Sequence, residues 1–306
     1  MRHTQNTRPM QSNLPSVFLG NNLSKTSAVR KLSQILSRLA PALALALAVT
    51  GAVAAQVAPP VGPYGFVLNA TFSNPSTNGG AAILGLMNFD GAGNVSGPYN
   101  FELGSGGSGP KQSIAGSFTG TYSSNPDGTG TISVALDVDI NLTLAMVIDN
   151  RGRGLQLAVT GCTHPAESGR MCSNSGVVIS GVGEIEFNAF VHPVHQGFLN
   201  GSYGLQFTKS SPTPAASLAV FSFDGAGNVS LSSTFIGADL SVASETLFGT
   251  YSVNPDGTGT IIVPPQPGSL MGQTYVFVIA EGHSGLLVLQ TNRAGDGVMY
   301  GTGRLQ

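Results

Sequence analysis

Hydrophobic and polar residues alternate one by one along most of the chain. Between residues 131 and 140, Ile132, Val134, Leu136, Val138 and Ile140 are separated by Thr, Ser, Ala and Asp residues. A period of two residues is typical of a β-strand with one apolar and one polar face. No stretch between such segments repeats with the helical period of about 3.6 residues, so the pattern predicts an all-β protein.

Eight strand candidates of this kind follow one another in the first half of the chain beyond its leader, and eight matching segments follow in the second half. The first eight are residues 64–72, 81–89, 94–103, 113–123, 130–140, 142–149, 154–161 and 176–187. Because the connections between them are short, neighbouring strands are expected to run antiparallel in a meander.

The two halves are copies of one another. The block GTYSSNPDGTGTISV at residues 120–134 returns at 249–263 with two differences, Ser124 to Val253 and Ser133 to Ile262. The block FDGAGNVS at residues 89–96 recurs letter for letter at 223–230. This tandem duplication predicts two domains, and the second copy is expected to fold alone because it carries every hairpin signal of the first.

Each copy is expected to form a closed barrel. Eight meandering strands would leave two exposed edges unless the sheet closed on itself. Eight strands also make a barrel whose interior side chains fill, or that holds one small ligand. The predicted architecture is therefore two tandem eight-stranded antiparallel up-and-down barrels, with a pair of β-sandwiches as the alternative. The expected divisions are a leader at 1–55, a Pro-rich linker at 56–63, the first barrel at 64–187, a second linker at 188–201 and the second barrel at 202–306.

Both recurring blocks have the residues of tight turns. Asn125 can bond the backbone with its side chain, Pro126 fixes φ near about −65°, and Gly128 can take the left-handed conformation that closes a bulge. A calcium loop is the alternative at Asp90 and Asn94, but an EF-hand needs more acidic ligands and a distal Glu. The structural turn residues predicted in the two copies are Asp90, Gly91, Gly93, Asn125, Pro126, Asp127, Gly128, Asp224, Gly225, Gly227, Asn254, Pro255, Asp256 and Gly257.

The layout of strands and hairpins resembles the streptavidin, lipocalin and allene-oxide-cyclase-like (calycin) up-and-down barrels. This resemblance is architectural only, since the lipocalin G-x-W signature needs a Trp and the chain has none. The repeated motifs FDGxGN and GTYxxNPDGTGT resemble those of uncharacterised secreted bacterial repeat proteins. That resemblance covers both copies and implies export, but it brings no activity with it.

The N-terminal region has the order of segments that marks a secretory signal peptide. Arg30, Lys31 and Arg38 precede an apolar run at residues 39–50, and an A-x-A pattern follows at residues 52–54. Basic, apolar and small-residue segments in this order predict Sec-type export, with cleavage near Ala54 or Ala55. The mature protein is then expected in the periplasm or outside the cell, and it meets the membrane only through the cleaved leader.

The charge balance excludes one class of partner. All 15 acidic residues follow residue 55, while six of the 13 basic residues precede it, which leaves a net charge of −8 beyond the leader. An acidic surface repels phosphate backbones, so nucleic acid is not expected as a partner. With 41% hydrophobic and 9% charged residues, the composition is also unlike that of a disordered chain.

Two cysteines, Cys162 and Cys172, fall in an insertion that the second copy lacks. In an exported protein, two cysteines so close together predict a disulfide. The alternative is a reactive thiol pair. It would need a lowered thiol pKa and a spacing like that of Cys-x-x-Cys, and the sequence shows neither.

The histidines do not form a metal motif. His192 and His195 lie between the copies, and His164 lies in the cysteine loop, but no third ligand has the spacing of a metal site. They are expected to be linker histidines. No cofactor is expected either, because Gly91 and Gly93 precede no helix that could receive a phosphate, and no G-x-S-x-G element is present.

Four carboxylates remain as candidates for acid–base chemistry inside a barrel. The strand register decides whether each points inward, and a solvated outward side chain is the favoured reading for all of them. Tyr122 and Tyr251 occupy equivalent positions and are expected to pack at a hairpin base with their hydroxyls at the rim. The four carboxylates are those of Glu102, Glu184, Glu186 and Glu245.

These patterns favour an exported, non-enzymatic binding or cell-surface interaction protein. Its expected partner is a small apolar ligand or a cell-surface component. One alternative is an isomerase or cyclase that uses a barrel cavity, which would need at least two polar groups converging on an apolar pocket. The second alternative is a single outer-membrane barrel of sixteen strands, but the chain has no Trp for an aromatic girdle.

Overall fold

The computed structural model describes residues 56–72, 79–104, 112–149, 152–163, 178–185, 193–210, 215–236, 242–267, 272–291 and 298–306. The predicted leader at residues 1–55 lies outside these ranges. Within them, no helix has both the length and the apolar character that crossing a membrane requires.

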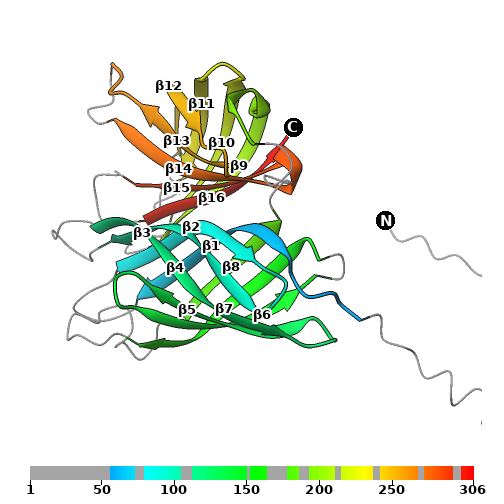
Figure 1. Cartoon of the computed structure of the whole chain (residues 1–306). Coiled ribbons are helices and arrows are strands. Elements are labelled where there is room, and N and C mark those ends of the chain that lie inside the picture. Colours follow the sequence, from blue (N-terminus) through cyan, green and yellow to red (C-terminus); the bar gives the residue numbers. More distant parts are fainter. Residues whose placement is uncertain are drawn as a thin grey trace, which may run out of the picture. The chain divides into compact units, whose positions relative to one another are not determined.

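The first copy closes into an eight-stranded antiparallel barrel (Figure 1). Each strand pairs with the next along the chain, and β8 pairs with β1 from Tyr64–Ile185 to Thr71–Val178, which closes the sheet. The strands are β1 (Gly62–Phe72), β2 (Gly79–Phe89), β3 (Asn94–Gly104), β4 (Gln112–Ser124), β5 (Thr129–Leu136), β6 (Asn141–Ile148), β7 (Gly154–Thr163) and β8 (Val178–Ile185).

The second copy closes in the same way, because its last strand pairs with its first. The prediction of two tandem eight-stranded antiparallel barrels is confirmed, and both the pair of sandwiches and the single sixteen-stranded barrel are wrong. The strands are β9 (Asn200–Ser210), β10 (Ala215–Asp224), β11 (Asn228–Ile236), β12 (Val242–Val253), β13 (Thr258–Val263), β14 (Gln273–Ala280), β15 (Gly285–Gln290) and β16 (Val298–Leu305), with 3-10 helices η1 (Gln196–Phe198) and η2 (Glu281–His283).

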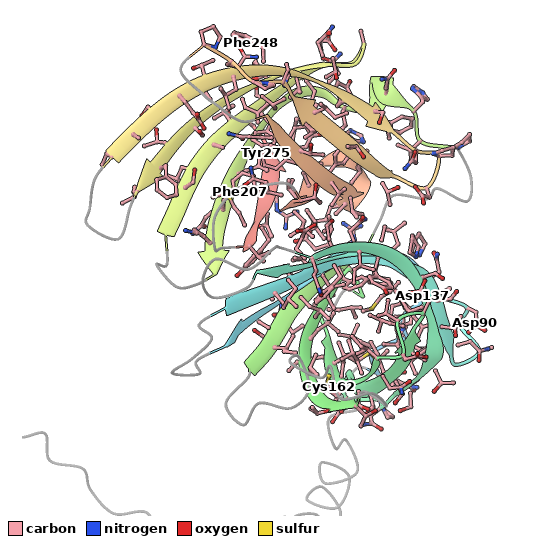
Figure 2. The ribbon with its side chains drawn as sticks, turned by 90° about the vertical axis from the view of Figure 1, so that its left-hand side faces the viewer. Asp90, Asp137, Cys162, Phe207, Phe248 and Tyr275 are labelled. Carbon is pink, nitrogen blue, oxygen red and sulfur yellow. The ribbon has the colours of Figure 1, made fainter. Side chains whose placement is uncertain are left out.

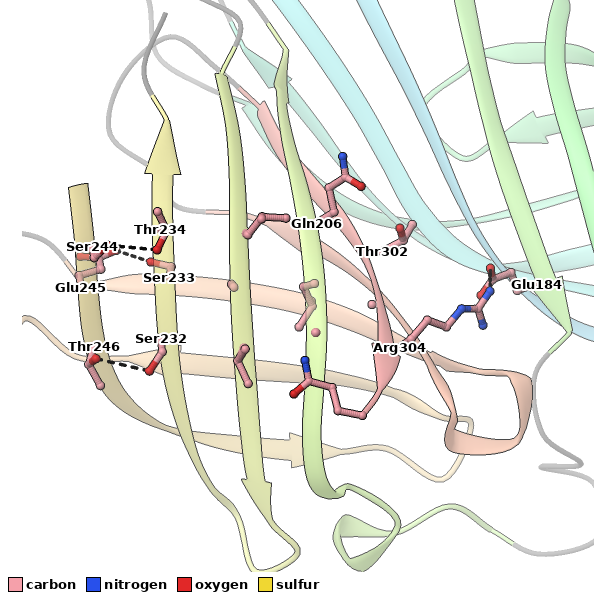
Figure 3. A pocket seen from close by; sticks show the side chains of 17 residues that line it. Glu184, Gln206, Ser232, Ser233, Thr234, Ser244, Glu245, Thr246, Thr302 and Arg304 are labelled. Carbon is pink, nitrogen blue, oxygen red and sulfur yellow. Dashed lines mark hydrogen bonds and ion pairs between the residues drawn. The ribbon is translucent and has the colours of Figure 1, made fainter. Parts of the chain in front are cut away.

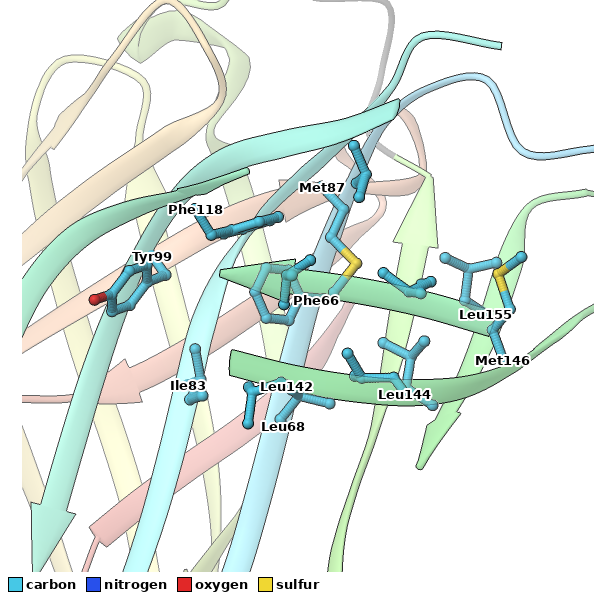
Figure 4. Close-up of a cluster of buried hydrophobic side chains, with 14 of the residues drawn as sticks. Phe66, Leu68, Ile83, Met87, Tyr99, Phe118, Leu142, Leu144, Met146 and Leu155 are labelled. Atoms are coloured by element: carbon cyan, nitrogen blue, oxygen red, sulfur yellow. The ribbon is translucent and has the colours of Figure 1, made fainter. Parts of the chain in front are cut away.

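Apolar side chains fill the interior of the first barrel, as the alternation predicts. Every second residue of β5, from Ile132 to Leu136, is buried, and the residues between them are exposed or half-buried. Phe66 and Phe118 meet edge to face inside the barrel, with ring centroids 5.9 Å apart (Figure 4). The cavity beside them measures about 10 Å³, and all of its lining residues are apolar. A space of that size holds at most about one water molecule, so it cannot hold a ligand.

β5 ends at Leu136, earlier than the pattern predicts. Asp139 has a positive φ of 60°, so the chain turns before β6. The Asp137 carboxylate anchors this turn, because it accepts hydrogen bonds from the Tyr99 hydroxyl at 2.7 Å and from the Ser117 N–H at 2.8 Å. The alternation that continues past Leu136 in the sequence therefore belongs to a turn.

The residues that precede each barrel also close one of its ends. Val57 N donates to Pro126 O at 3.0 Å, and Val194 N donates to Pro255 O at 3.2 Å, so the two copies repeat this contact. Val194 and Leu199 are buried. Where the structure describes these two segments, they pack against the barrels. Each brings an apolar side chain and a backbone N–H donor to the Asn-Pro-Asp-Gly turn.

A third apolar cluster joins the outer faces of the two barrels, which belong to one unit of residues 55–306. A Cβ added to Gly65 would lie 2.7 Å from Val278 Cγ1, so only a glycine lets the two surfaces approach this closely. At the rim, Arg304 pairs with Glu184 at 2.8 Å and also with Glu281. The buried members of the cluster are Val67, Ala82, Leu84 and Leu86 of the first barrel and Val278, Leu287, Leu289 and Val298 of the second.

The barrels use non-equivalent faces for this contact. When the copies are aligned by strand register, some apolar residues of the contact become polar or smaller at the equivalent positions of the other copy, while Leu84 and Val278 keep apolar equivalents in Leu218 and Val147. These replacements reduce the apolar match that a second, equivalent head-to-tail contact would need. The equivalent face of the second barrel therefore stays open. The aligned pairs are Val67 with Gln206, Val182 with Thr302, Leu287 with Gln156 and Leu289 with Ala158.

Candidate functional site

The Phe-Asp-Gly-Ala-Gly-Asn blocks are self-contained turns between β2 and β3 and between β10 and β11. Asp90 Oδ1 accepts from Ala92 N at 2.7 Å and Asn94 N at 2.9 Å, while Asn94 Nδ2 donates to Asp90 Oδ2 at 2.6 Å. Asp224 makes the same three bonds in the second copy. The left-handed conformation required of the turn glycines is present at Gly91, Gly93, Gly225 and Gly227, whose φ angles are 76°, 102°, 75° and 107°.

The Asn-Pro-Asp-Gly blocks are turns of the same kind. Gly128 N donates to Asn125 O at 3.0 Å, and Gly128 has a φ of 86°. Asp127 Oδ1 accepts from Thr129 N at 2.9 Å and from Thr129 Oγ1 at 2.7 Å. Asn254, Pro255, Asp256 and Gly257 repeat the arrangement, with a φ of 80° at Gly257. The carboxylates of all four blocks thus face their own loops, and among the described residues no group of three or more His, Cys, Asp or Glu residues is placed to hold a metal ion.

These bonds make stability depend on pH at the acid end. Neighbouring side chains donate hydrogen bonds that lower the pKa of Asp90, Asp127, Asp137 and Asp224 below 3.8. A carboxyl whose pKa is lowered by folding stabilises the native state above its unfolded pKa, and this contribution is lost as pH falls through the folded value. We expect the denaturation midpoint to fall on acidification below pH 3.8, and to fall less in Asp137→Asn. An equal fall in both proteins, measured by denaturant titration, would show that the Asp137 contacts do not form.

The paired tyrosines lie where the sequence placed them. The Tyr122 hydroxyl donates to Pro60 O at 3.1 Å, and the Tyr251 hydroxyl donates to Leu199 O at 2.9 Å. Burial raises the pKa of both hydroxyls. Each tyrosine therefore ties the segment that precedes a barrel to the end of that barrel, which is a structural role.

Few of the predicted polar candidates come together. His195 Nδ1 accepts from Gly197 N at 3.2 Å at the start of η1, and its ring packs against Phe198. Cys162 lies in β7, whereas its predicted disulfide partner Cys172 lies outside the described residues, as do His164, His192 and Glu186.

The carboxylates of the strands do not converge either. Glu102 is on the outer face of β3 but is only 1% exposed, so the expectation of a solvated side chain is wrong there. Its face of β3 lies beside the buried outer face of β2, where the barrels meet. Burial raises the pKa of Glu184, although the charge of Arg304 opposes the shift. Glu245 is exposed on β12 and accepts from Ser233 Oγ at 3.3 Å.

A groove of about 820 Å³ lies on the outer face of the second barrel (Figure 3). Its lining comes from β9, β10, β11, β12 and β16, together with Glu184 of β8. Gln206 and Thr302 line it, and these are the residues that replace the apolar docking residues of the first barrel. The groove is thus the repeat-equivalent of the contact face, left open, with polar residues at two of its positions and apolar residues kept at Leu218 and Val220.

Uncharged hydrogen-bonding groups dominate one wall of this groove. Ser232 and Thr246 face each other across β11 and β12 at 3.4 Å, and Thr234 and Ser244 do so at 3.1 Å. Leu218, which is 61% exposed, adds an apolar surface on β10. Such a groove suits a ligand that makes many weak polar contacts around an apolar centre.

The arginine at the end of the groove has its charge already paired. Arg304 contacts Glu184 and Glu281. With Glu184 and Glu245 also in the lining, the groove carries no uncompensated positive charge among the described residues. An anionic ligand is therefore disfavoured here, in agreement with the net charge of the chain beyond its leader.

Sequence reasoning missed this groove. The lining residues belong to no motif, and they are far apart along the chain. The available signal was the comparison of the copies, in which Val67 becomes Gln206 and Val182 becomes Thr302. That signal has meaning only after the register shows that these positions share one outer face.

No protein-family model matches the chain, and comparison with curated proteins finds no significant relative. Among solved structures, twelve chains match. One is a protein of unknown function of the DUF3598 family from Nostoc punctiforme, at 10% identity, covering 80% of this chain and 96% of that one, with a TM-score of 0.24. Another is isotype 1 transferrin binding protein B from Neisseria meningitidis, at 6% identity, covering 82% and 78%, with a TM-score of 0.28. A third, CghA, is 9% identical, with coverages of 80% and 88% and a TM-score of 0.25. Likeness at this level carries no argument about function.

Proposed function

We propose that the protein is an exported, non-enzymatic binding protein that attaches to a cell-surface component through the groove on its second barrel. One observation carries the proposal. The face that the first barrel uses for docking is repeated on the second barrel as an open groove of about 820 Å³, lined by hydroxyl and amide groups beside apolar side chains. The first barrel then acts as a filled scaffold.

The interior of the first barrel leaves no room there for the ligand-binding or enzymatic alternatives that the sequence left open. A small apolar ligand would need an internal cavity, but the space among Phe66, Phe118 and their neighbours is about 10 Å³. A barrel-cavity isomerase would need polar groups on that cavity, and its lining residues are all apolar. A role in binding through the outer surface needs neither an internal cavity nor polar groups inside the barrel.

The test is whether the groove mediates attachment to cells. Labelled protein is incubated with intact producing cells, and the bound fraction is measured by fluorescence. Thr234→Arg should reduce binding at least about tenfold, because a long charged side chain fills the groove. Gln156→Arg, on the exposed outer face of the first barrel, is the matched control. Equal binding of the two variants would refute the proposal.

Export is the second part of the proposal. The order of basic, apolar and small-residue segments before residue 56 supports a cleaved leader. N-terminal sequencing of protein recovered from the periplasm or the medium should begin near Gln56. Recovery of a chain that still begins at Met1 would contradict it.

A disulfide between Cys162 and Cys172 is the third part. It would close the only long insertion that distinguishes the first copy in sequence. In the chain-entropy model a loop this short contributes roughly 3 kcal/mol. We expect the denatured exported protein to react with a maleimide only after reduction, and reduction to lower its melting temperature. Rapid labelling without reductant would show free thiols.

A further inference from the structure

β12 has one edge that is open over most of its length. It pairs with β11 from Val242 to Thr250, but with β13 only from Thr250 to Val253. In the first copy, β4 pairs with β5 from Phe118 to Ser124, so residues 112–117 of β4 also lack a β5 partner and the ladder is three positions longer than in the second copy. Among the described residues, therefore, no strand pairs with the β13-facing edge of β12 between residues 242 and 248.

The sequence explains why β13 is short and pairs with only the last four residues of β12. β13 ends at Val263, and Pro264 and Pro265 follow it. Proline has no N–H to donate to a ladder, so the strand cannot continue there. In the first copy the equivalent residues extend β5 to Leu136, and Asp137 N then donates to Ser117 O at 3.1 Å, which closes that edge further.

The backbone groups of the open edge point away from β11. Tyr251 N donates to Gly227 O at 2.8 Å, so the odd-numbered residues of β12 face β11 and the even-numbered ones face the opening. Among these, Phe248 O accepts a hydrogen bond from Gln266 Nε2 at 3.2 Å. Val242 and Phe248 are 67% and 61% exposed, and Phe248 lies on the outside of the second barrel in Figure 2. An exposed strand edge flanked by large apolar side chains is a template for adding another strand.

Four inward-facing side chains of the second barrel carry polar groups at this same end, at positions where the first barrel has apolar side chains. Gln290 is 4% exposed, and its Oε1 accepts no hydrogen bond from any described residue. A buried amide oxygen without a donor is costly, so its presence points to a donor that a ligand supplies. The aligned pairs are Val159 with Gln290, Ile83 with Ser217, Leu142 with Gln273 and Leu144 with Tyr275.

We propose that the second barrel takes up an extended peptide segment of a partner protein as an added strand along β12. Its backbone pairs with the even-numbered residues from Val242 to Phe248. Its inward side chains carry hydrogen-bond donors, because the Gln290 side-chain oxygen offers an acceptor at this end of the barrel. The outward side chains of the peptide lie beside Val242 and Phe248. This inference rests on the proposed binding role and names the class of partner.

The experiment uses the full chain and a seven-residue probe of alternating valine and lysine, capped at both ends and labelled with fluorescein. Binding is followed by fluorescence anisotropy. The probe should bind, and a version methylated on alternate backbone nitrogens should bind at least about tenfold more weakly, because it loses backbone hydrogen bonds. Hydrogen exchange should show that the unmodified probe protects the amides of Ser244 and Thr246.

Two proline variants locate the site on the protein. Thr246→Pro removes an edge N–H while leaving the ladder to β11 intact, so it should bind the probe at least about tenfold more weakly than Thr246→Ala. Ser244→Pro should behave in the same way, and melting curves show whether each variant is folded. No binding to the wild type, equal affinity for the methylated probe, or equal affinity of the folded Pro and Ala variants would each overturn the inference. If Thr234→Arg still abolishes attachment to cells in that case, the proposed function stands without it.

Discussion

Gly181→Ala should be among the most damaging single changes in this chain, although it adds only one methyl group. An added Cβ would lie 1.9 Å from Val67 O and 2.8 Å from Leu68 Cα. These are backbone atoms of β1, so a side-chain rotation cannot relieve the collision. The β1–β8 ladder that closes the first barrel would have to open. We expect a loss of about 2–4 kcal/mol in the free energy of unfolding, measured by denaturant titration.

Gly161→Ala is the matched control for this prediction. Its added Cβ would make only ordinary contacts, at 3.4 Å to Thr143 Cβ and 3.5 Å to Thr143 Oγ1. The same substitution one strand away should therefore change stability by less than about 0.5 kcal/mol. If the two variants unfold alike, β8 does not approach β1 this closely and the first barrel is not closed as described.

Leu287→Ala should cost about 2–5 kcal/mol, because Leu287 is fully buried although it points out of its own barrel. It belongs to the cluster between the barrels, and a Cβ on Gly65 would lie 3.3 Å from its Cδ1. Leu287→Ala lowers the free energy of unfolding by this amount only if the two barrels pack together. A separate second barrel would hold Leu287 in water, and the change would then be nearly neutral.

The repeat itself supplies the control for this substitution. Gln156 occupies the position of Leu287 in the first copy and is exposed on β7. Gln156→Ala should change the free energy of unfolding by less than about 0.5 kcal/mol. A loss in Leu287→Ala no larger than in Gln156→Ala would mean that the interface is absent in solution.

The alternation of residues and the turn glycines were enough to predict the fold. A two-residue period, turns at Gly128 and Gly257 and the need to cover sheet edges together lead to two closed barrels. The boundary of β5 was less predictable, because Asp137 and Ile140 keep the strand period while Asp139 turns the chain. The alternation of apolar and polar residues indicates which face of a strand each side chain occupies. A turn can show the same alternation over a few residues.

The sequence contains a sign of the contact between the barrels, but the alternation of apolar and polar residues does not reveal it. Residues 81–87 of β2 and 286–289 of β15 are continuous apolar runs, and both are buried almost throughout. A continuous run is typical of a strand covered on both faces. Which other strand covers it depends on the tertiary arrangement, so the partner face and the need for glycine at Gly65 followed only from the structure.

The groove was the least predictable feature. Ser232, Thr234, Ser244 and Thr246 are ordinary residues for the wet face of a strand. Their importance comes from the curvature of the outer face and from Glu184 of the other barrel. Thr129 was also missed, since its hydroxyl bonds to Asp127 and Asn125, although its recurrence within both turn blocks was visible.

Site-specific photo-crosslinking on intact cells tests the central claim most directly. A photoreactive amino acid is placed at Thr234, within the groove, or at Gln156, on the exposed outer face of the first barrel. Both proteins are exported by the producing cells and irradiated in place. If the second barrel carries the binding surface, a covalent adduct with the cell envelope forms from position 234 and not from position 156. Adducts from both positions in equal yield, or from position 156 alone, would contradict the account.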